Sequence, residues 1–180
     1  DDIYMATEDL KEVFERMVKA FAGELGAGVD IKLGDLKDPV RIYEKAQDDY
    51  KGDFDDWDDG KVIPESCVVD VIRARVVVKT AEQMLALQQG LREGFERKLS
   101  GALGGTWRLE LVRAKNKFSN VVAENRGLAG LDPTHFRNIR NNVKLVHVAS
   151  GRSTFAEMQA QHCAILEHND ASHAHDHYNF

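Results

Sequence analysis

The sequence predicts an α/β (α+β) fold, in which helices flank a mixed sheet of roughly five strands. Two observations predict it: stretches with apolar residues at helical spacing alternate with short β-branched segments, and Gly or Pro residues separate most of them. The expected order is helix, strand, helix, strand, helix, strand, strand, strand, helix. Because three strands follow one another near the end, we expect hairpin-like connections and a sheet that is not purely parallel.

The whole chain is expected to form one domain, because 180 residues suffice for a single sizeable core. Residues 1–28 are expected to contain an N-terminal helix, with Thr7 as N-cap and Gly26 as the stop. Residues 29–180 would form the rest of the core, beginning with a short alternating strand at 29–33. Since the first residue is not Met, we expect this domain to be part of a longer polypeptide.

Two further helices are marked by the residues that begin them. Asp38 and Pro39 begin one of them, with proline in the first turn, where a backbone N–H is not needed. Thr80 begins the other, and Gln83 completes the pattern of a capping box. Apolar residues continue at helical spacing as far as Leu99, so we expect this third helix to extend to that residue.

The segment 68–78 is unusual, because it is rich in Val and Ile on both faces and yet contains three charged residues. Such a strand is typical of the middle of a sheet. A charge buried there is costly unless it is paired or binds a ligand. Asp70, Arg73 and Arg75 therefore form either an internal ion-pair network or the floor of a site for an anionic, metal-bound substrate. Asp70 and Arg75 can share a site only if the chain bends near Asp70.

The remaining elements are less strongly marked. Strands are expected at 107–118, 136–148 and 153–159, and a helix from about residue 162. The acidic segment 48–64 is expected to be a loop. Two cysteines lie far apart in the sequence in apolar surroundings, which favours buried free thiols over a disulfide.

The charge distribution indicates which kinds of ligand or partner the protein can bind. A net charge of −6 argues against a protein that coats nucleic acid, so no long nucleic acid is expected. Residues 111–150, however, contain seven Lys or Arg against two acidic residues, which suits a compact polyanion such as a nucleotide, although a solvated basic face has the same composition. No apolar run is long enough to span a membrane. We expect a cytoplasmic site of action; the oligomeric state stays open.

The candidate site combines charged, amide and aromatic residues from five segments of the chain: Lys37, Arg41, Lys45, Asp70, Arg75, Lys115, Phe136, Arg140, Glu157 and Gln159. Taken singly, each has a plain structural explanation. Glu157 could be a charge at the rim of the sheet, Phe136 a core aromatic residue, and Arg41 with Glu44 a solvated pair on a helix.

The order of these segments resembles that of the RelA/SpoT-type alarmone ((p)ppGpp) synthetase domain, of which this chain would be a divergent member. The similar segments run from about residue 31 to the end. Lys37-x-Pro-x-x-Ile-Tyr-x-Lys45 is similar to the family's Lys-Ser-Pro-x-Ser-Ile-x-x-Lys, Asp70-Val-Ile-Arg-Ala-Arg75 to Asp-Ile-x-Gly-Ile-Arg, Lys115-Asn-Lys-Phe118 to Lys-Asp-Tyr, Phe136-Arg-Asn-Ile-Arg140 to Tyr-Arg-Ser-Leu-His, Glu157-Met-Gln159 to Glu-Val-Gln, and His175-Asp-His-Tyr178 to a trailing His-x-x-Tyr.

The resemblance implies a nucleotidyltransferase-like synthetase fold and an enzyme that transfers pyrophosphate from ATP to the 3′-hydroxyl of GDP or GTP with Mg²⁺. It implies that Asp70 and Glu157 are metal ligands, with Glu157 alternatively taking the proton of the hydroxyl. It also implies that Lys37, Arg41 and Lys45 contact the ATP phosphates, that Arg75 lies against adenine and that Phe136 lies under the acceptor base. Further substrate contacts would come from Lys115, Arg140 and Gln159. Mg²⁺ needs one or two carboxylates besides phosphate oxygens, which fits this set.

Several residues differ from the family pattern. Asp35 stands where the family has Arg, Arg73 where it has Gly, Phe136 where it has Tyr, and Arg140 where it has His. These differences leave open an adenine nucleotide or the 3′ end of an RNA as acceptor. They also leave open a catalytically silent nucleotide-binding or regulatory relative, and a toxin or effector that uses the same fold.

Overall fold

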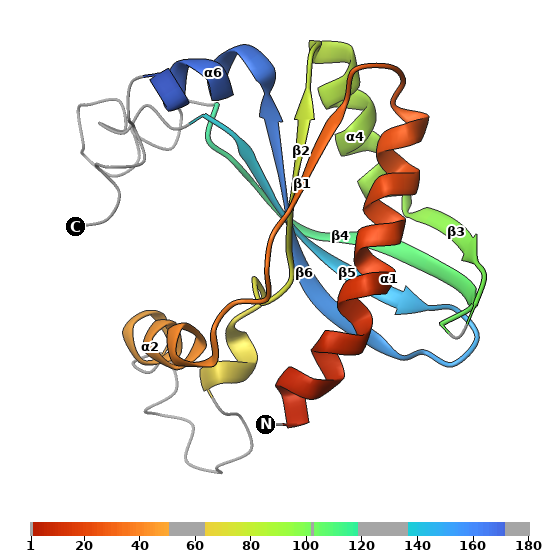
Figure 1. The fold of residues 1–180 in the computed structure, drawn as a ribbon, viewed down its shortest axis with the longest axis vertical. Helices are drawn as coiled ribbons and strands as arrows, with labels where there is room; N and C mark the ends of the chain where they lie inside the picture. Colours follow the sequence, from red (N-terminus) through yellow and green to blue (C-terminus); the bar gives the residue numbers. More distant parts are fainter. Residues whose placement is uncertain (1, 51–63, 102, 119–136, 172–180) are drawn as a thin grey trace.

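The computed structural model describes residues 2–50, 64–101, 103–118 and 137–171. Their centre is one six-stranded mixed sheet, twisted and strongly curled (Figure 1). Neighbouring strands are antiparallel except for β2 and β6, which are parallel. The strand order across the sheet is β1 (Asp30–Leu33), β2 (Arg73–Val78), β6 (Ser153–His162), β5 (Ile139–His147), β4 (Gly105–Asn116) and β3 (Phe95–Leu99).

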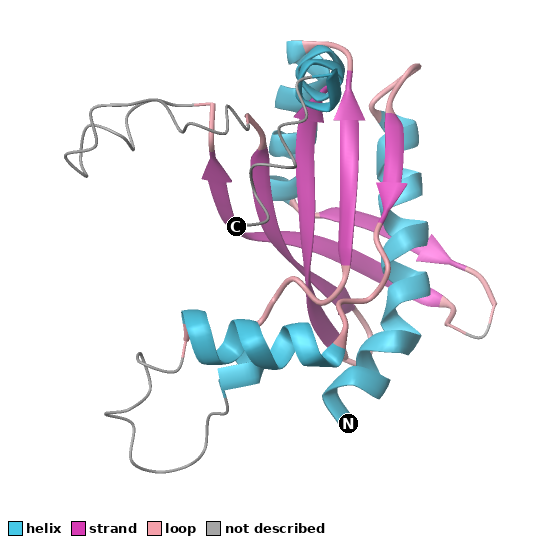
Figure 2. Cartoon of the chain, turned by 60° about the vertical axis from the view of Figure 1, so that its left-hand side comes forward, coloured by secondary structure: helices cyan, strands magenta, loops and turns pink. Residues whose placement is uncertain are grey.

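The helices lie on both sides of this sheet. Helices α1 (Asp2–Glu24) and α4 (Ala81–Glu93) cover one face, whereas α2 (Pro39–Asp49), the short 3₁₀ helix η1 (Pro64–Cys67) and α6 (Cys163–Ala171) lie on the other side (Figures 1 and 2). None of the helices in the described part of the chain is long and apolar enough to cross a membrane.

The alternation of side chains gives the sheet two different faces. Toward α1 and α4 it presents small and aliphatic residues that join the main core, among them Ala74, Val76, Val143, Leu145 and Met158. The opposite face carries charged and amide side chains. A second, small cluster of buried residues joins α2 to the start of β2, and it consists of Ala46, Val68 and Val71.

The structure confirms the fold class and the helix starts predicted at Asp38 and Thr80. Asp38 accepts a hydrogen bond from the backbone N–H of Val40 at 2.8 Å. Thr80 accepts one from the N–H of Gln83 at 3.2 Å, and the Gln83 side chain accepts one in return from the N–H of Lys79. The expected strand pattern is also present, with one strand more than the five expected.

The additional strand is the largest correction. The sequence predicted one helix from residue 80 to Leu99, but α4 ends at Glu93 and β3 begins at Phe95. Gly94 lies between them with φ +85°, a conformation that suits glycine and ends the helix. Phe95 and Leu99 still face the core, because pairing with β4 puts both on its inner side.

Three smaller expectations are also corrected. Strand β2 begins only at Arg73, since residues 69–72 form turns and bends, which is the bend that a shared site of Asp70 and Arg75 requires. Helix α1 begins at Asp2 rather than near Thr7. Both cysteines are free, as expected, but they are half-buried rather than buried.

Candidate functional site

The face of the sheet turned away from α1 and α4 collects two rows of polar side chains, which we call the polar face. In the first row, the register places Arg73 of β2 opposite Glu157 of β6. Glu157 in turn lies opposite Asn142 of β5, and Asn142 lies opposite Arg113 of β4. The next row, two residues further along each strand, consists of Arg75, Gln159, Arg140 and Lys115. Directly paired residues point to the same side of a sheet. The pairing therefore brings together residues that are up to 86 positions apart in sequence, from Arg73 to Gln159.

Asp70 lies in the turn before β2 and is held by two lysines. Its Oδ2 atom accepts hydrogen bonds from the Nζ of Lys37 at 2.6 Å and from the Nζ of Lys45 at 2.8 Å. Lys37 precedes α2 and Lys45 lies in its second turn, so the N-cap at Asp38 helps to position both. The other oxygen of Asp70, Oδ1, is buried and has no hydrogen-bond partner among the described residues.

The protonation of this cluster follows from burial and charge. Burial alone would raise the pKa of Asp70, but the hydrogen bonds and positive charges of Lys37 and Lys45 outweigh it and lower that pKa below its usual value. Burial lowers the pKa of Lys37, aided by the charges of Lys45 and Arg73. The pKa of Lys45 is raised, because Asp70, together with the weaker influence of Tyr50 and Asp49, outweighs burial there. Asp70 is therefore an anion at neutral pH.

A cavity of about 230 Å³ opens between α2, the Asp70 turn and the polar face. Both predicted catalytic carboxylates, Asp70 and Glu157, line it, together with the predicted residues Lys45, Lys115 and Arg140. Glu157 is buried, and its Oε1 accepts a hydrogen bond from the Nε2 of Gln159 at 2.7 Å. The cavity therefore brings two carboxylates and several cations together.

Two arginines of the second row of the polar face present unused hydrogen-bonding capacity. The Nε atoms of Arg75 and Arg140 are buried, and so is the Oε1 of Gln159. None of these atoms has a hydrogen-bond partner in the part of the chain that the structure describes. Burial lowers the pKa of Arg75, although the charges of Asp170 in α6 and of Glu157 oppose this effect. Buried polar groups are normally satisfied, so such atoms are typical of a site that binds a ligand or ordered water.

The predicted residue Arg41 is not among those that line this cavity. Arg41 is exposed and forms an ion pair with Glu44 at 3.2 Å, which is the solvated helix pair that the sequence offered as a plain explanation of these residues. It also lines a second hollow of about 280 Å³ with Lys37 and Lys45, on the outer side of α2. Phe136 lies outside the described residues, so its proposed role under a base stays a prediction.

Arg113, Asn142, Asp49 and Tyr50 also line the 230 Å³ cavity, but they were not among the predicted site residues. For Arg113 and Asn142 a signal existed in the sequence. They lie two residues from Lys115 and Arg140 respectively, which is the spacing of one strand face. For Asp49 and Tyr50, at the end of α2, we find no such signal.

The donor set fits Mg²⁺ only in part. No group of three or more His, Cys, Asp or Glu in the described residues could hold a metal ion by itself. Mg²⁺, however, is usually bound by one or two carboxylates and completed by water and phosphate oxygens. The unpartnered Oδ1 of Asp70 and the carboxylate of Glu157 offer that number of ligands, so the residues fit an ion that arrives with a phosphate group.

With this geometry, comparison with known proteins becomes informative. No family model and no curated protein sequence matches the chain. Among solved structures, it is similar to small alarmone synthetase 1 from Bacillus subtilis, with 12% identity, a TM-score of 0.59, and coverage of 96% of this chain and 76% of the other. A second structure of that enzyme, bound to its product pppGpp, matches with 15% identity, a TM-score of 0.52, and coverage of 98% and 77%.

A GTP pyrophosphokinase family protein from Streptococcus pneumoniae has the same fold, with 14% identity, a TM-score of 0.54, and coverage of 98% of this chain and 74% of the other. The chain thus has the alarmone synthetase fold, and the similar structures include pyrophosphokinases. At these identities the likeness concerns the fold alone, so the resemblance seen in the sequence motifs is confirmed at that level.

Proposed function

We propose that this domain transfers pyrophosphate from ATP to the 3′-hydroxyl of a nucleotide acceptor, with a cytoplasmic site of action. The observation that supports this most directly is the cavity in which Asp70 and Glu157 face Lys45, Arg113, Lys115 and Arg140. Phosphoryl-type transfer depends mainly on positioning and on charge neutralisation, and this wall of cations supplies both.

In the proposed reaction, the 3′-oxygen of the acceptor forms a bond to the β-phosphorus of ATP. The bond from that phosphorus to the α,β-bridging oxygen breaks, so AMP leaves and the β- and γ-phosphates are transferred. Glu157 accepts the proton of the hydroxyl, because a buried carboxylate within reach of the attacking oxygen can act as a general base. Mg²⁺ would be held by Asp70 and phosphate oxygens, or by Asp70 and Glu157 if Glu157 does not take the proton, and it would neutralise phosphate charge.

The acceptor is proposed to be GDP or GTP, with an adenine nucleotide or an RNA 3′ end as the alternatives. The test incubates the domain with ATP, Mg²⁺ and each of GDP, GTP, ADP, AMP and a short RNA, and identifies the products by mass spectrometry. We expect AMP and one acceptor that is heavier by a pyrophosphate group. Glu157→Gln should lower the rate by about 100-fold or more, since general bases contribute this much. Pyrophosphate transfer at an unchanged rate in this variant would contradict the assignment.

A second candidate, a nucleotide-binding relative without activity, is favoured by one observation. Two lysines occupy Oδ2 of Asp70, as in a structural ion pair. This candidate predicts saturable nucleotide binding in calorimetry with no product from any acceptor. Any pyrophosphate transfer would dismiss it.

A further inference from the structure

Arg73 is a cation of the polar face that lines neither of the two cavities, and it stands where the family pattern has glycine. It is the first residue of β2, and its backbone carbonyl accepts a hydrogen bond from the N–H of Gly34 at 3.0 Å. The parallel pairing with β6 places it directly opposite Glu157. Its side chain therefore stands beside the predicted catalytic carboxylate, on the β1 side of it.

Among the residues that the structure describes, no carboxylate forms an ion pair with Arg73. The carboxylate of Glu157 bonds to Gln159 rather than to Arg73. Asp70 is already shared between Lys37 and Lys45. Arg73 is only partly exposed, its Nε is buried without a hydrogen-bond partner, and it forms no ion pair with any residue in the described ranges.

Arg73 also lies close to a second cation. The backbone N–H of Lys37 donates a hydrogen bond to the carbonyl of Val71 at 3.0 Å, two residues before Arg73, so the two cations lie at the same end of β2. Lys37, Lys45 and Arg73 are thus three cations that lie near two carboxylates, those of Asp70 and Glu157. Half-buried like charges repel one another, and this arrangement is stable at low cost only when a further anion lies among them.

We propose that Arg73 binds the polyphosphate chain of the donor nucleotide, together with Lys37 and Lys45. The guanidinium is planar and presents paired N–H donors, which match two oxygens of a phosphate group better than an ammonium group does. This inference rests on the proposed function, since it assigns one residue to the donor side of the same site.

The experiment measures binding by calorimetry, with Mg²⁺ and two probes. The first probe is α,β-methylene-ATP, which has the donor's phosphates but cannot be cleaved between the α- and β-phosphorus, and the second is AMP. For Arg73→Met we expect the affinity for α,β-methylene-ATP to fall about tenfold or more, because a charge-assisted bond to phosphate is lost, whereas AMP binding stays unchanged. Arg73→Lys should restore part of the affinity.

Arg97→Met is the matched control. Arg97 lies on the same sheet, on edge strand β3, and pairs with Glu24 at 3.2 Å, so its loss should leave both affinities as in the wild type. Thermal melting of every variant shows whether it is folded, and Arg73→Gln replaces Arg73→Met if the latter is not.

The outcomes separate the two proposals. If the wild type binds neither probe, the proposed function fails. If the wild type binds α,β-methylene-ATP and the Arg73 variants bind it within about twofold, the function stands and the inference is overturned. An equal loss for both probes would also overturn it, because the contact would then not be to the β- or γ-phosphate.

Discussion

The ion pairs of Asp70 should contribute to the stability of the folded protein. Two ammonium groups share one of its oxygens, and the side chain retains only 13% of its exposure. Removing one partner of such a cluster leaves uncompensated charge, which is costly where solvent is scarce. We therefore expect Asp70 to stabilise the fold before it takes part in any chemistry.

Asp70→Asn tests this at the residue scale. The pKa of Asp70 is lowered in the folded state, so its pairing stabilises the protein fully above the ordinary value of about 4 and is lost as the pH falls through the lowered pKa. At pH 7 the variant should lose about 1.5–3 kcal/mol of unfolding free energy, the range for hydrogen bonds to charged groups. The deficit should shrink in acid, as measured by urea unfolding from pH 7 to 2.5.

Asp9→Asn is the control for this series. Asp9 pairs with Arg152 at 3.4 Å, but both side chains are largely exposed, so this change should have little effect at any pH. A deficit of Asp70→Asn that remained the same from pH 7 to pH 2.5 would contradict the assigned pairing.

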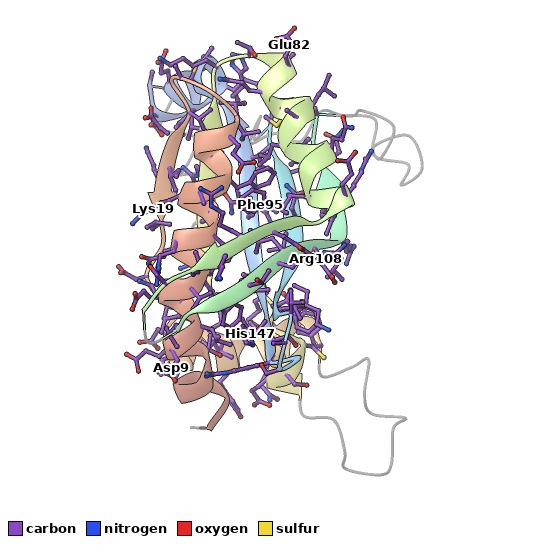
Figure 3. All side chains as sticks on the ribbon, turned by 90° about the vertical axis from the view of Figure 1, so that its right-hand side faces the viewer. Asp9, Lys19, Glu82, Phe95, Arg108 and His147 are labelled. Carbon is purple, nitrogen blue, oxygen red and sulfur yellow. The ribbon has the colours of Figure 1, made fainter. Side chains whose placement is uncertain are left out.

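At the scale of elements, the packing of α1 against α4 and β3 depends on one close approach. The ring of Phe21 in α1 stacks on that of Phe95 in β3, with ring centroids 4.5 Å apart. Phe95 is labelled in Figure 3, which views the sheet from the side of these helices. A Cβ atom at Gly90 of α4 would lie 2.7 Å from the Phe21 ring. Gly90 is therefore needed for space rather than for backbone conformation.

Two glycine-to-alanine changes in helices separate these effects. Gly90→Ala should destabilise the protein by about 1–3 kcal/mol, because the added methyl group overpacks the contact with Phe21. Gly23→Ala in α1 meets nothing within 4 Å and should be neutral or stabilise by up to about 1 kcal/mol through helix propensity. Urea unfolding measures both. If both changes altered the free energy of unfolding equally, the Phe21 ring would not need the space that Gly90 leaves free.

At the scale of the whole molecule, the described chain has two apolar clusters of unequal size. The main core lies between the sheet and helices α1 and α4, whereas α2 is anchored by the small cluster of Ala46, Val68 and Val71. Local opening costs less free energy where few apolar contacts must break. Helix α2, which supplies Lys45, should therefore open more readily than the central strands.

Hydrogen exchange measured by mass spectrometry tests this organisation. In the absence of ligand, the amides of α2 should exchange faster than those of β5 and β6. Addition of α,β-methylene-ATP with Mg²⁺ should slow exchange in α2, because a ligand that contacts Lys37 and Lys45 stabilises the folded, packed state of this helix relative to its locally opened state. If the amides of α2 exchanged as slowly as those of β6 without ligand, the small apolar cluster would not be less stable than the main core.

Much of the fold was predictable from local sequence. The caps at Asp38 and Thr80 depend on side chains that bond to backbone only a few residues away, and they formed as expected. Strand β3 was not predictable in this way. Phe95 and Leu99 fit a helix face as well as a strand face, and only pairing with β4 decides between them.

The sequence by itself determined which side chains could serve a polyanion, since a carboxylate, a lysine or an arginine has the same chemistry wherever the chain places it. The tertiary structure alone decided which of them meet. The parallel pairing of β2 with β6 set Arg73 opposite Glu157, and the turn at Asp70 brought that carboxylate to Lys37 and Lys45. Register and turns decide such distances between residues far apart in the chain, and no local pattern of the sequence contains them.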